Sequence, residues 1–269
     1  MAKTVLVFAP HPDDAEFYAG GTLLHFVEEG ARVVIVIISD GSKGSFSLAG
    51  EDLAAIRYEE AHRACLSLGA EPPVMLDLTD FELDLLPRGY LRERLIYYIR
   101  LYHPDILVCE DPYSLDEPHP DHRVVAWAAY EAANFSYLTT VHPNHFDEGL
   151  QPHYVVEKYF YTHNPQRINK VIDIAAYFEG KIAALLEHKS QIAFLMEDIF
   201  RQARMAGINF QNKIGPEASD PTAIFRWIMH RQAADAGRPA GLVLGESFHY
   251  ERFNPMVEDV LQQPDKESS

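Results

Sequence analysis

The chain opens with short apolar runs that alternate with longer segments of helical periodicity. Four such runs predict strands, and the valine and isoleucine content of the first two predicts that these strands are buried. The four runs cover residues 4–8, 33–38, 74–78 and 106–110. The longer segments carry apolar residues three or four positions apart, which predicts amphipathic helices. These segments are residues 15–29, 51–68, 88–102 and 122–133.

Successive β-α units predict the fold class. Four of them in a row favour an α/β protein with a Rossmann-like, open, mainly parallel sheet and helices on both faces. In the common strand order 3-2-1-4, the strands at 4–8 and 106–110 are neighbours. Their carboxyl ends then meet where the winding direction reverses, which is the usual place for a ligand in such sheets.

The second half of the chain is less regular. A loop at 138–153 contains His142, His145 and His153, and their irregular spacing favours surface or rim residues over a second metal site. Beyond it, the pattern predicts two short strands, a long helix, a shorter helix and a closing segment. These are residues 154–162, 170–174, 175–196, 222–234 and 241–253. Without a repeat or a long linker, we expect a single domain over 1–269, with a frayed tail at 256–269.

The charge and cysteine content of the chain limit its partners. Acidic residues outnumber basic ones by 40 to 23, and the formal net charge of −17 argues against a nucleic-acid or anionic-membrane surface. Cys65 and Cys109 are too few for a disulfide framework and are expected as buried thiols. No apolar stretch reaches the ~18 residues of a membrane span, and no basic segment precedes the first apolar run. We therefore expect a cytoplasmic protein.

Two polar turns follow the strands that are expected to be neighbours. The first, PHPDDAE, places His11 beside Asp13 and Asp14, and the second, PHPDH, places His119 and His122 at a helix start. Either turn alone is typical of a polar helix N-terminus. Together, at facing strand ends, they predict a metal site. The two histidines of the second turn are three residues apart, so one can ligate while the other stays free.

Such a residue set favours hydrolysis. Two neutral imidazoles and one carboxylate hold zinc and leave a position for water, and the same set suits ferrous iron. The metal lowers the pKa of its water from about 15.7 to about 7. The other carboxylate of an adjacent pair is then free to act as general base. A cationic imidazole three residues from a ligand can stabilise an oxyanion, and His119 fits that role.

Both motifs resemble those of the PIG-L/LmbE-like zinc N-deacetylases, a family that includes enzymes acting on N-acetylglucosamine groups. PHPDDAEFYAGG is similar to the family's AHPDDxExxxGG, and PHPDH is similar to its second motif. Weaker echoes are Arg57 with Glu60, the KxxxxxxHxSQ pattern from Lys181, and GESF. The resemblance implies an LmbE-like fold in which residues 1–137 form the metal-binding core and residues 138–255 shape the pocket.

The resemblance also implies roles for single residues of the two turns. The metal ligands would be His11, Asp14 and His122, holding Zn2+, with Fe2+ or another divalent metal as the alternative. Asp13 would be the general base, and His119 the oxyanion stabiliser or proton donor.

Of two positions outside the ligand set, one has a second interpretation and the other departs from the family pattern. The resemblance implies that Arg57 contacts substrate hydroxyls, whereas its helical spacing equally allows a surface ion pair with Glu60. Some relatives carry a tyrosine two residues before the first histidine of the second motif. This chain has Glu117 at that position, so the resemblance does not extend to transition-state stabilisation by a tyrosine.

The function implied is removal of the N-acetyl group from an N-acetylglucosamine-type sugar or glycoside by metal-activated water. Relatives often form trimers or hexamers, so a homo-oligomer is implied by analogy. One alternative is an amidase of the same family that acts on a non-sugar N-acyl metabolite. Another is a catalytically idle sugar-binding module, which predicts a missing ligand or base, and none is missing. A nucleotide-binding module is disfavoured because the first turn lacks G-x-G-x-x-G.

Overall fold

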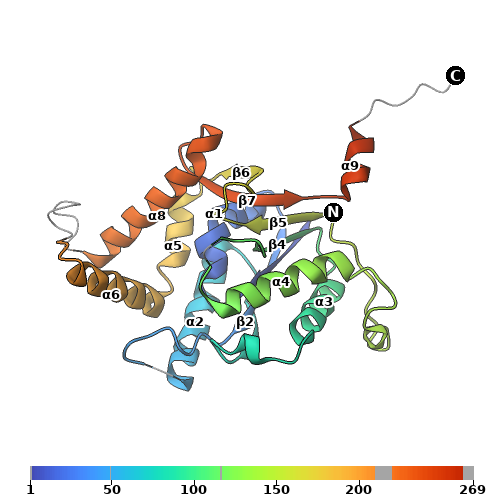
Figure 1. Ribbon diagram of the computed structural model, residues 1–269, viewed down its shortest axis with the longest axis horizontal. Helices are drawn as coiled ribbons and strands as arrows, with labels where there is room; N and C mark the ends of the chain where they lie inside the picture. The colour runs from blue at the N-terminus through green and yellow to red at the C-terminus, as the bar shows by residue number, and fades with distance from the viewer. Residues whose placement is uncertain (1, 49, 116, 210–219, 263–269) are drawn as a thin grey trace.

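The computed structural model describes residues 2–48, 50–115, 117–209 and 220–262, and its centre is one twisted sheet (Figure 1). The strands follow the order β3-β2-β1-β4-β5-β7-β6. Neighbours from β3 to β5 are parallel, whereas β7 is antiparallel to β5 and β6. Their bounds are β1 Thr4–Ala9, β2 Arg32–Ser39, β3 Val74–Leu78, β4 Ile106–Glu110, β5 Glu157–Tyr161, β6 Lys170–Asp173 and β7 Gly245–Glu251. The predicted mainly parallel α/β sheet and its 3-2-1-4 order are confirmed.

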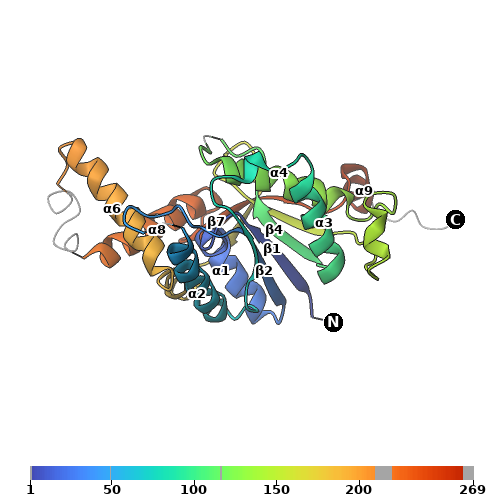
Figure 2. The same ribbon diagram turned by 90° about the horizontal axis from the view of Figure 1, so that it is seen from below.

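Helices cover both faces of the sheet. In Figure 2 the sheet lies between α1 and α2 on one side and α3 and α4 on the other. The helices are α1 Asp14–Glu28, α2 Glu51–Leu68, α3 Tyr90–Tyr102, α4 Pro120–Phe135, α5 Phe178–Leu185, α6 Lys189–Met205, α8 Pro221–Gly237 and α9 Pro255–Leu261. Short 3-10 turns are η1 Leu83–Leu85, η2 Pro143–Phe146 and η4 Arg238–Ala240.

Burial on both faces explains why the central strand β1 carries no polar residue after Thr4. Val5 and Val7 pack with α1 and α2, while Leu6 and Phe8 pack with α3 and α4, and all four are fully buried. Because successive side chains of a strand point to opposite faces, a strand covered on both sides reads as a continuous apolar run. Val5 pairs with Val33 of β2 on one side and with Ile106 of β4 on the other.

The expected long helix at 175–196 is wrong. The structure has two helices, α5 and α6, separated at His188, whose φ of −81° and ψ of 58° are not helical. Glu60 of α2 explains the break, because its carboxylate accepts hydrogen bonds from the Ser190 backbone N–H at 2.9 Å and hydroxyl at 2.6 Å. An acceptor from another helix thus satisfies the free amide at the start of α6. Sequence periodicity does not reveal this partner.

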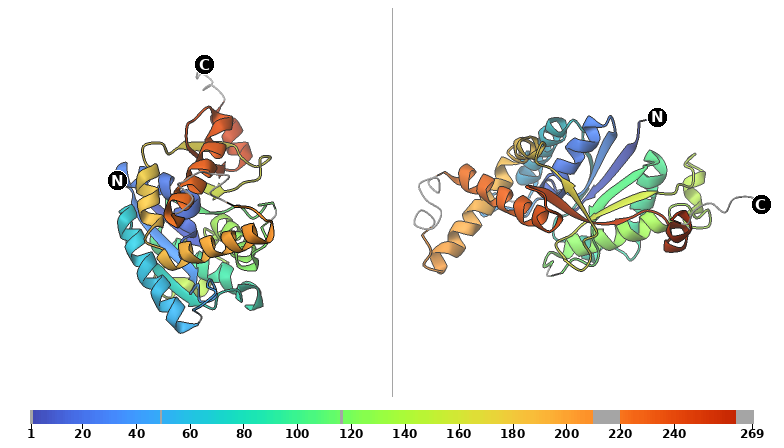
Figure 3. Two further views of the ribbon diagram at one scale, coloured as in Figure 1. Left: turned by 90° about the vertical axis from the view of Figure 1, so that its left-hand side faces the viewer. Right: turned by 90° about the horizontal axis from the view of Figure 1, so that it is seen from above.

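Helices α6 and α8 extend from one end of the sheet, whereas α9 lies at the opposite end (Figures 1 and 3). Helix α9 occupies the start of the tail expected at 256–269, and residues 263–269 lie outside the described residues. Cys65 and Cys109 are free and buried, as predicted. None of the helices in the described residues is long and apolar enough to cross a membrane.

Candidate metal centre

The two polar turns meet at the carboxyl ends of β1 and β4. Strand β1 runs directly into the turn at Pro10–Asp13, and Asp13 adopts a φ of 117°, which is unusual for a residue with a side chain. The Asp13 side chain does not cap α1. The Asp14 carboxylate turns back instead and accepts a 2.8 Å hydrogen bond from the His11 backbone N–H. The carboxylates of this turn therefore serve something other than helix capping.

Three donor atoms converge between the turns. His11 Nδ1 lies 3.1 Å from His122 Nε2 and 3.2 Å from Asp14 Oδ2, and the last two atoms are 3.4 Å apart. A tetrahedral ion with bonds of about 2.0–2.2 Å needs ligand atoms about 3.3–3.6 Å apart. All three side chains are buried. The residues present therefore fit a metal ion, and they are the three residues that the family resemblance implies as ligands.

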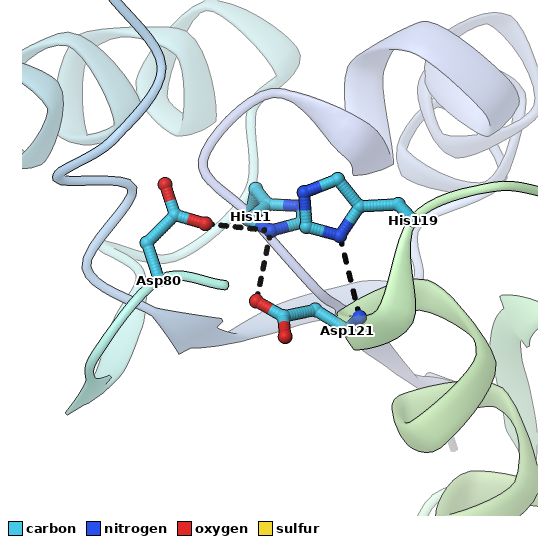
Figure 4. A group of neighbouring side chains, drawn as sticks. All are labelled: His11, Asp80, His119 and Asp121. Carbon is cyan, nitrogen blue, oxygen red and sulfur yellow. Dashed lines mark hydrogen bonds and ion pairs between the residues drawn. The ribbon is translucent and has the colours of Figure 1, made fainter. Parts of the chain in front are cut away.

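Acidic side chains hold the far side of the His11 ring. His11 Nε2 lies 3.2 Å from Asp80 Oδ1 and 3.3 Å from Asp121 Oδ2 (Figure 4). Asp121 is itself fixed, because its two oxygens accept hydrogen bonds from the backbone N–H groups of Phe81 and Leu83 at 2.7 and 3.1 Å. Metal-binding histidines usually present their second nitrogen to a carboxylate, which sets the tautomer and the ring orientation.

The His122 ring is held in the same way. Its Nδ1 lies 3.0 Å from Glu110 Oε2 at the end of β4, and 3.6 Å from Glu117 Oε2. Both Glu110 Oε2 and this Nδ1 are buried and have no hydrogen-bond partner among the described residues, so their contact is a close ion pair and not a well-aligned hydrogen bond. Burial lowers the pKa of His122, but the carboxylates of Asp14, Glu110 and Glu117 outweigh it and raise the pKa to about 10. A site this acidic favours a cation.

Within the described part of the chain, two other groups of donor atoms are close enough to hold a metal. One is His11, Asp80, His119 and Asp121, and the other is Glu110, Glu117 and His122. In the first group, Asp80 Oδ2 already accepts from the Lys43 backbone N–H at 2.9 Å, and both Asp121 oxygens accept backbone N–H groups. In the second group, Glu117 Oε1 accepts from the His119 backbone N–H at 2.8 Å. These carboxylates are better described as supports for the two ligand rings.

Asp13 lies beside the ligands in a nearly closed environment. Its side chain is buried, and its Oδ1 accepts a 3.2 Å hydrogen bond from Arg57 Nη2. Burial raises the pKa of Asp13 to about 6, against the opposing effect of the Arg57 charge. A carboxyl group with a pKa near neutrality can both accept and return a proton, which suits a general base.

Arg57 is buried, so the alternative of a surface ion pair with Glu60 is wrong. Its guanidinium also donates to the backbone carbonyls of Pro12 at 2.6 Å and Gly41 at 3.1 Å. It therefore braces the turn that carries Asp13. Its predicted contact with substrate hydroxyls stays a prediction.

His119 stands at the start of α4 and its ring packs on that of His11, with centroids 4.5 Å apart. Its Nδ1 accepts a 3.3 Å hydrogen bond from the Asp121 backbone N–H, so the ring proton lies on Nε2 (Figure 4). Burial, with the charges of His11 and His122, lowers the pKa of His119. The ring is therefore a neutral N–H donor, where the sequence favoured a cationic one.

The three loop histidines do not line the rim of the site. His145 is buried against α3, with Nδ1 3.2 Å from Arg100 Nη1 and Nε2 2.8 Å from Glu93 Oε1. The backbone N–H of His153 contacts Ser136 O, and His142 packs on His145. Ser136 follows the last residue of α4, the end opposite to His122. The expectation of surface or rim positions is wrong for His145, because Arg100 and Glu93 provide it with polar partners inside the protein.

The weaker motif matches at Lys181 and in GESF bring Lys181 and Glu246 together as a buried ion pair, which we call the brace. Glu246 accepts hydrogen bonds from the backbone N–H groups of Gly21 and Thr22, the Thr22 hydroxyl and Lys181 Nζ, at 2.6 to 3.0 Å. All of these groups are buried. The pair therefore ties α1, whose first turn carries Asp14, to α5 and β7.

Sequence reasoning missed Asp80 and Glu110. Glu110 is the last residue of β4, and Asp80 lies two residues after β3. A single carboxylate at the carboxyl end of a buried strand is a weak signal, but in a parallel sheet all such ends share one edge with the site.

Relatives of known name show which family this chain belongs to. A diacetylchitobiose deacetylase from Thermococcus kodakarensis is 34% identical over 192 residues, covering 70% of this chain and 70% of that protein. The chain belongs to the PIG-L family. The family, described as GlcNAc-PI de-N-acetylase, matches residues 6–133, which include both polar turns. The resemblance noted in the sequence is thereby confirmed.

Other members of the PIG-L family extend the likeness over more of the chain. A 1D-myo-inositol 2-acetamido-2-deoxy-alpha-D-glucopyranoside deacetylase from Mycobacteroides abscessus is 28% identical, over 71% of this chain and 81% of that protein. The solved structure of N,N'-diacetylchitobiose deacetylase from Pyrococcus horikoshii, complexed with its inhibitor MPG, matches with a TM-score of 0.75. It is 29% identical and covers 96% of this chain and 88% of that chain. These named relatives are deacetylases.

Proposed function

We propose that this protein is a metal-dependent hydrolase that removes the N-acetyl group from an N-acetylglucosamine-type sugar or glycoside. The convergence of His11 Nδ1, Asp14 Oδ2 and His122 Nε2 at 3.1 to 3.4 Å carries the proposal. The names of its relatives, which are deacetylases of diacetylchitobiose and of an acetamido-glucopyranoside, point to the same substrate class.

The ligand residues would hold Zn2+, with Fe2+ as the alternative. A divalent cation held there supplies an acidified water and polarises the amide carbonyl. Asp13 would take a proton from that water as its oxygen bonds to the carbonyl carbon. His119 Nε2–H would donate to the carbonyl oxygen while negative charge develops on it. The proton on Asp13 would then pass to the nitrogen as the C–N bond breaks, releasing acetate and a free amine.

Acetate release from N-acetylglucosamine and N,N'-diacetylchitobiose by zinc-loaded protein tests the proposal. We expect Asp13→Asn to lower kcat by about 10²–10⁴-fold, because the proton acceptor is lost, while zinc content stays the same. Asp52→Asn, an exposed change at the start of α2, is the matched control and should keep full activity. Full activity in Asp13→Asn would show that the base assignment is wrong.

A substrate panel separates the remaining alternatives. Acetate or another acid released only from non-sugar N-acyl compounds would favour an amidase of the same chemistry. Sugar binding without acid release would favour an idle module. A zinc titration with His122→Ala adds to the distinction, because a binding module would have no stoichiometric metal to lose.

The assignment of the chain as one deacetylase domain over 1–269 is part of the proposal. Its support is that β5, β6 and β7 continue the sheet begun by β1 to β4. A homo-oligomer, a trimer or hexamer by analogy, and a cytoplasmic location are also proposed. Native mass and cell fractionation test these two points.

A further inference from the structure

Phe81 is an aromatic residue in a position that the fold itself does not explain. Its side chain is 55% exposed, although it follows Asp80, whose carboxylate contacts His11. Its φ of 62° lies in the left-handed region, which is unfavourable for a bulky side chain. Exposure and backbone strain both oppose stability, and residues held in this way cluster at functional sites.

The metal centre itself holds Phe81 in this conformation. The Phe81 backbone N–H donates a 2.7 Å hydrogen bond to Asp121 Oδ2, the oxygen that lies 3.3 Å from His11 Nε2. Two residues further on, the Leu83 N–H donates to the other Asp121 oxygen at 3.1 Å. One carboxylate therefore orients a ligand ring and fixes the backbone on which Phe81 stands.

The Phe81 ring lies beside the proposed oxyanion donor. Its centroid is 5.2 Å from that of His119, at an interplanar angle of 82°, so the two rings meet edge to face. His119 is half-buried, and the Phe81 ring keeps more than half of its surface free. A group bound at His119 would have an apolar, flat surface next to it.

We infer that Phe81 is a sugar-stacking residue that selects pyranose substrates, an inference that rests on the proposed deacetylase function. A pyranose ring presents C–H groups on its face and hydroxyls on its rim. The free Phe81 face suits the C–H groups, while the surrounding carboxylates and His119 suit the polar rim. An acyclic N-acetyl compound offers no such face and gains nothing from the ring.

The test replaces the ring without adding strain. Asparagine tolerates the left-handed region, so Phe81→Asn should fold with unchanged or higher thermal stability and normal zinc content. Its KM for N-acetylglucosamine and N,N'-diacetylchitobiose should rise about tenfold with a small change in kcat. For N-(2-hydroxyethyl)acetamide, kcat/KM should stay the same. Phe81→Tyr should keep sugar affinity, and Leu85→Asn, a change at a 74% exposed residue of the same segment, is the matched control.

Ligand-observed NMR of N-acetylglucosamine with metal-free protein gives a readout that is independent of activity. We expect binding to wild type and Leu85→Asn, and at least fivefold weaker binding to Phe81→Asn, since one stacking contact is lost. If wild type releases acetate and Phe81→Asn keeps the same KM and the same sugar affinity, the inference is wrong and the proposed function stands. Sugar binding that depends on Phe81, without acetate release, supports the inference and overturns the function. Wild type that neither binds nor hydrolyses sugars overturns both. A changed native mass in Phe81→Asn would make the ring a contact between copies and overturn the sugar assignment.

Discussion

Glu110 offers the sharpest test of the ligand assignment, because its carboxylate forms an ion pair with one proposed ligand, His122. Its Oε2 lies 3.0 Å from His122 Nδ1, on the side of the ring opposite to the atom that faces His11. Glutamine keeps an oxygen at this place but removes the charge. Leucine removes the acceptor as well and suits the buried position at the end of β4.

The expected loss of zinc affinity follows from these differences. Carboxylates behind a metal-binding histidine typically contribute 10–100-fold to affinity, which is about 1.4–2.7 kcal/mol. Glu110→Gln should lie near the lower limit and Glu110→Leu near the upper one. Glu117→Gln should change affinity by less than about threefold, because Glu117 Oε2 is 3.6 Å from the same nitrogen, beyond a good hydrogen bond.

Competition between the protein and a chelating zinc indicator measures these affinities, and urea unfolding of the metal-free variants checks that each still folds. The metal-free Glu110→Leu protein should be at least as stable as wild type, since burial raises the pKa of Glu110 and so disfavours its charged form. Equal zinc affinity in wild type and Glu110→Leu would refute His122 as a ligand through Nε2. A larger loss of zinc affinity in Glu117→Gln than in Glu110→Gln would mean that Glu117, and not Glu110, is the carboxylate that supports the His122 ring.

Zinc binding should tighten by more than tenfold per pH unit as the pH rises from about 6, because carboxylates raise the pKa of both His11 and His122 in the metal-free protein and each ring must lose a proton to ligate; a flat profile in competition titrations would contradict this. Lys181→Met should destabilise the protein by about 3–5 kcal/mol in urea, because it leaves the buried Glu246 carboxylate without its cation. Lys3→Met, at an exposed ion pair, should cost less than about 1 kcal/mol, and equal effects would argue against the brace. Gly21→Ala should cost about 1–3 kcal/mol in the same assay, because a Cβ there would lie 2.6 Å from a methyl group of Ile174, and wild-type stability would mean that this side chain moves aside freely.

The parts of the fold that the sequence predicts well are those that local pattern determines. The strands at 74–78 and 106–110 and the helix at 51–68 have the predicted bounds, since short apolar runs and a helix ended by Gly69 are local signals. The break at His188 depends on Glu60, more than a hundred residues earlier, and no periodicity carries that information.

The site shows the same division. His11, Asp14 and His122 stand in two motifs, and the strand order that brings the motifs together follows from general rules for parallel sheets. Asp80 and Glu110 are isolated carboxylates outside the motifs, and only the three-dimensional arrangement shows that each faces a histidine ring. The tautomer of His119 likewise depends on a backbone contact that spacing alone does not predict.

The charge around the two ligand rings argues that the site evolved for a cation and for a neutral substrate. Each proposed histidine ligand touches carboxylates on both of its nitrogens. The acidic residues gathered here are Asp13, Asp14, Asp80, Glu110, Glu117 and Asp121. Arg57, the arginine in contact with the group, donates to Asp13 and to backbone carbonyls and offsets one charge at most. Such an excess of buried negative charge is unfavourable unless protons or a metal ion offset it. It would repel an anionic substrate, accept a neutral N-acetyl sugar, and favour the ammonium form of the amine that deacetylation leaves behind.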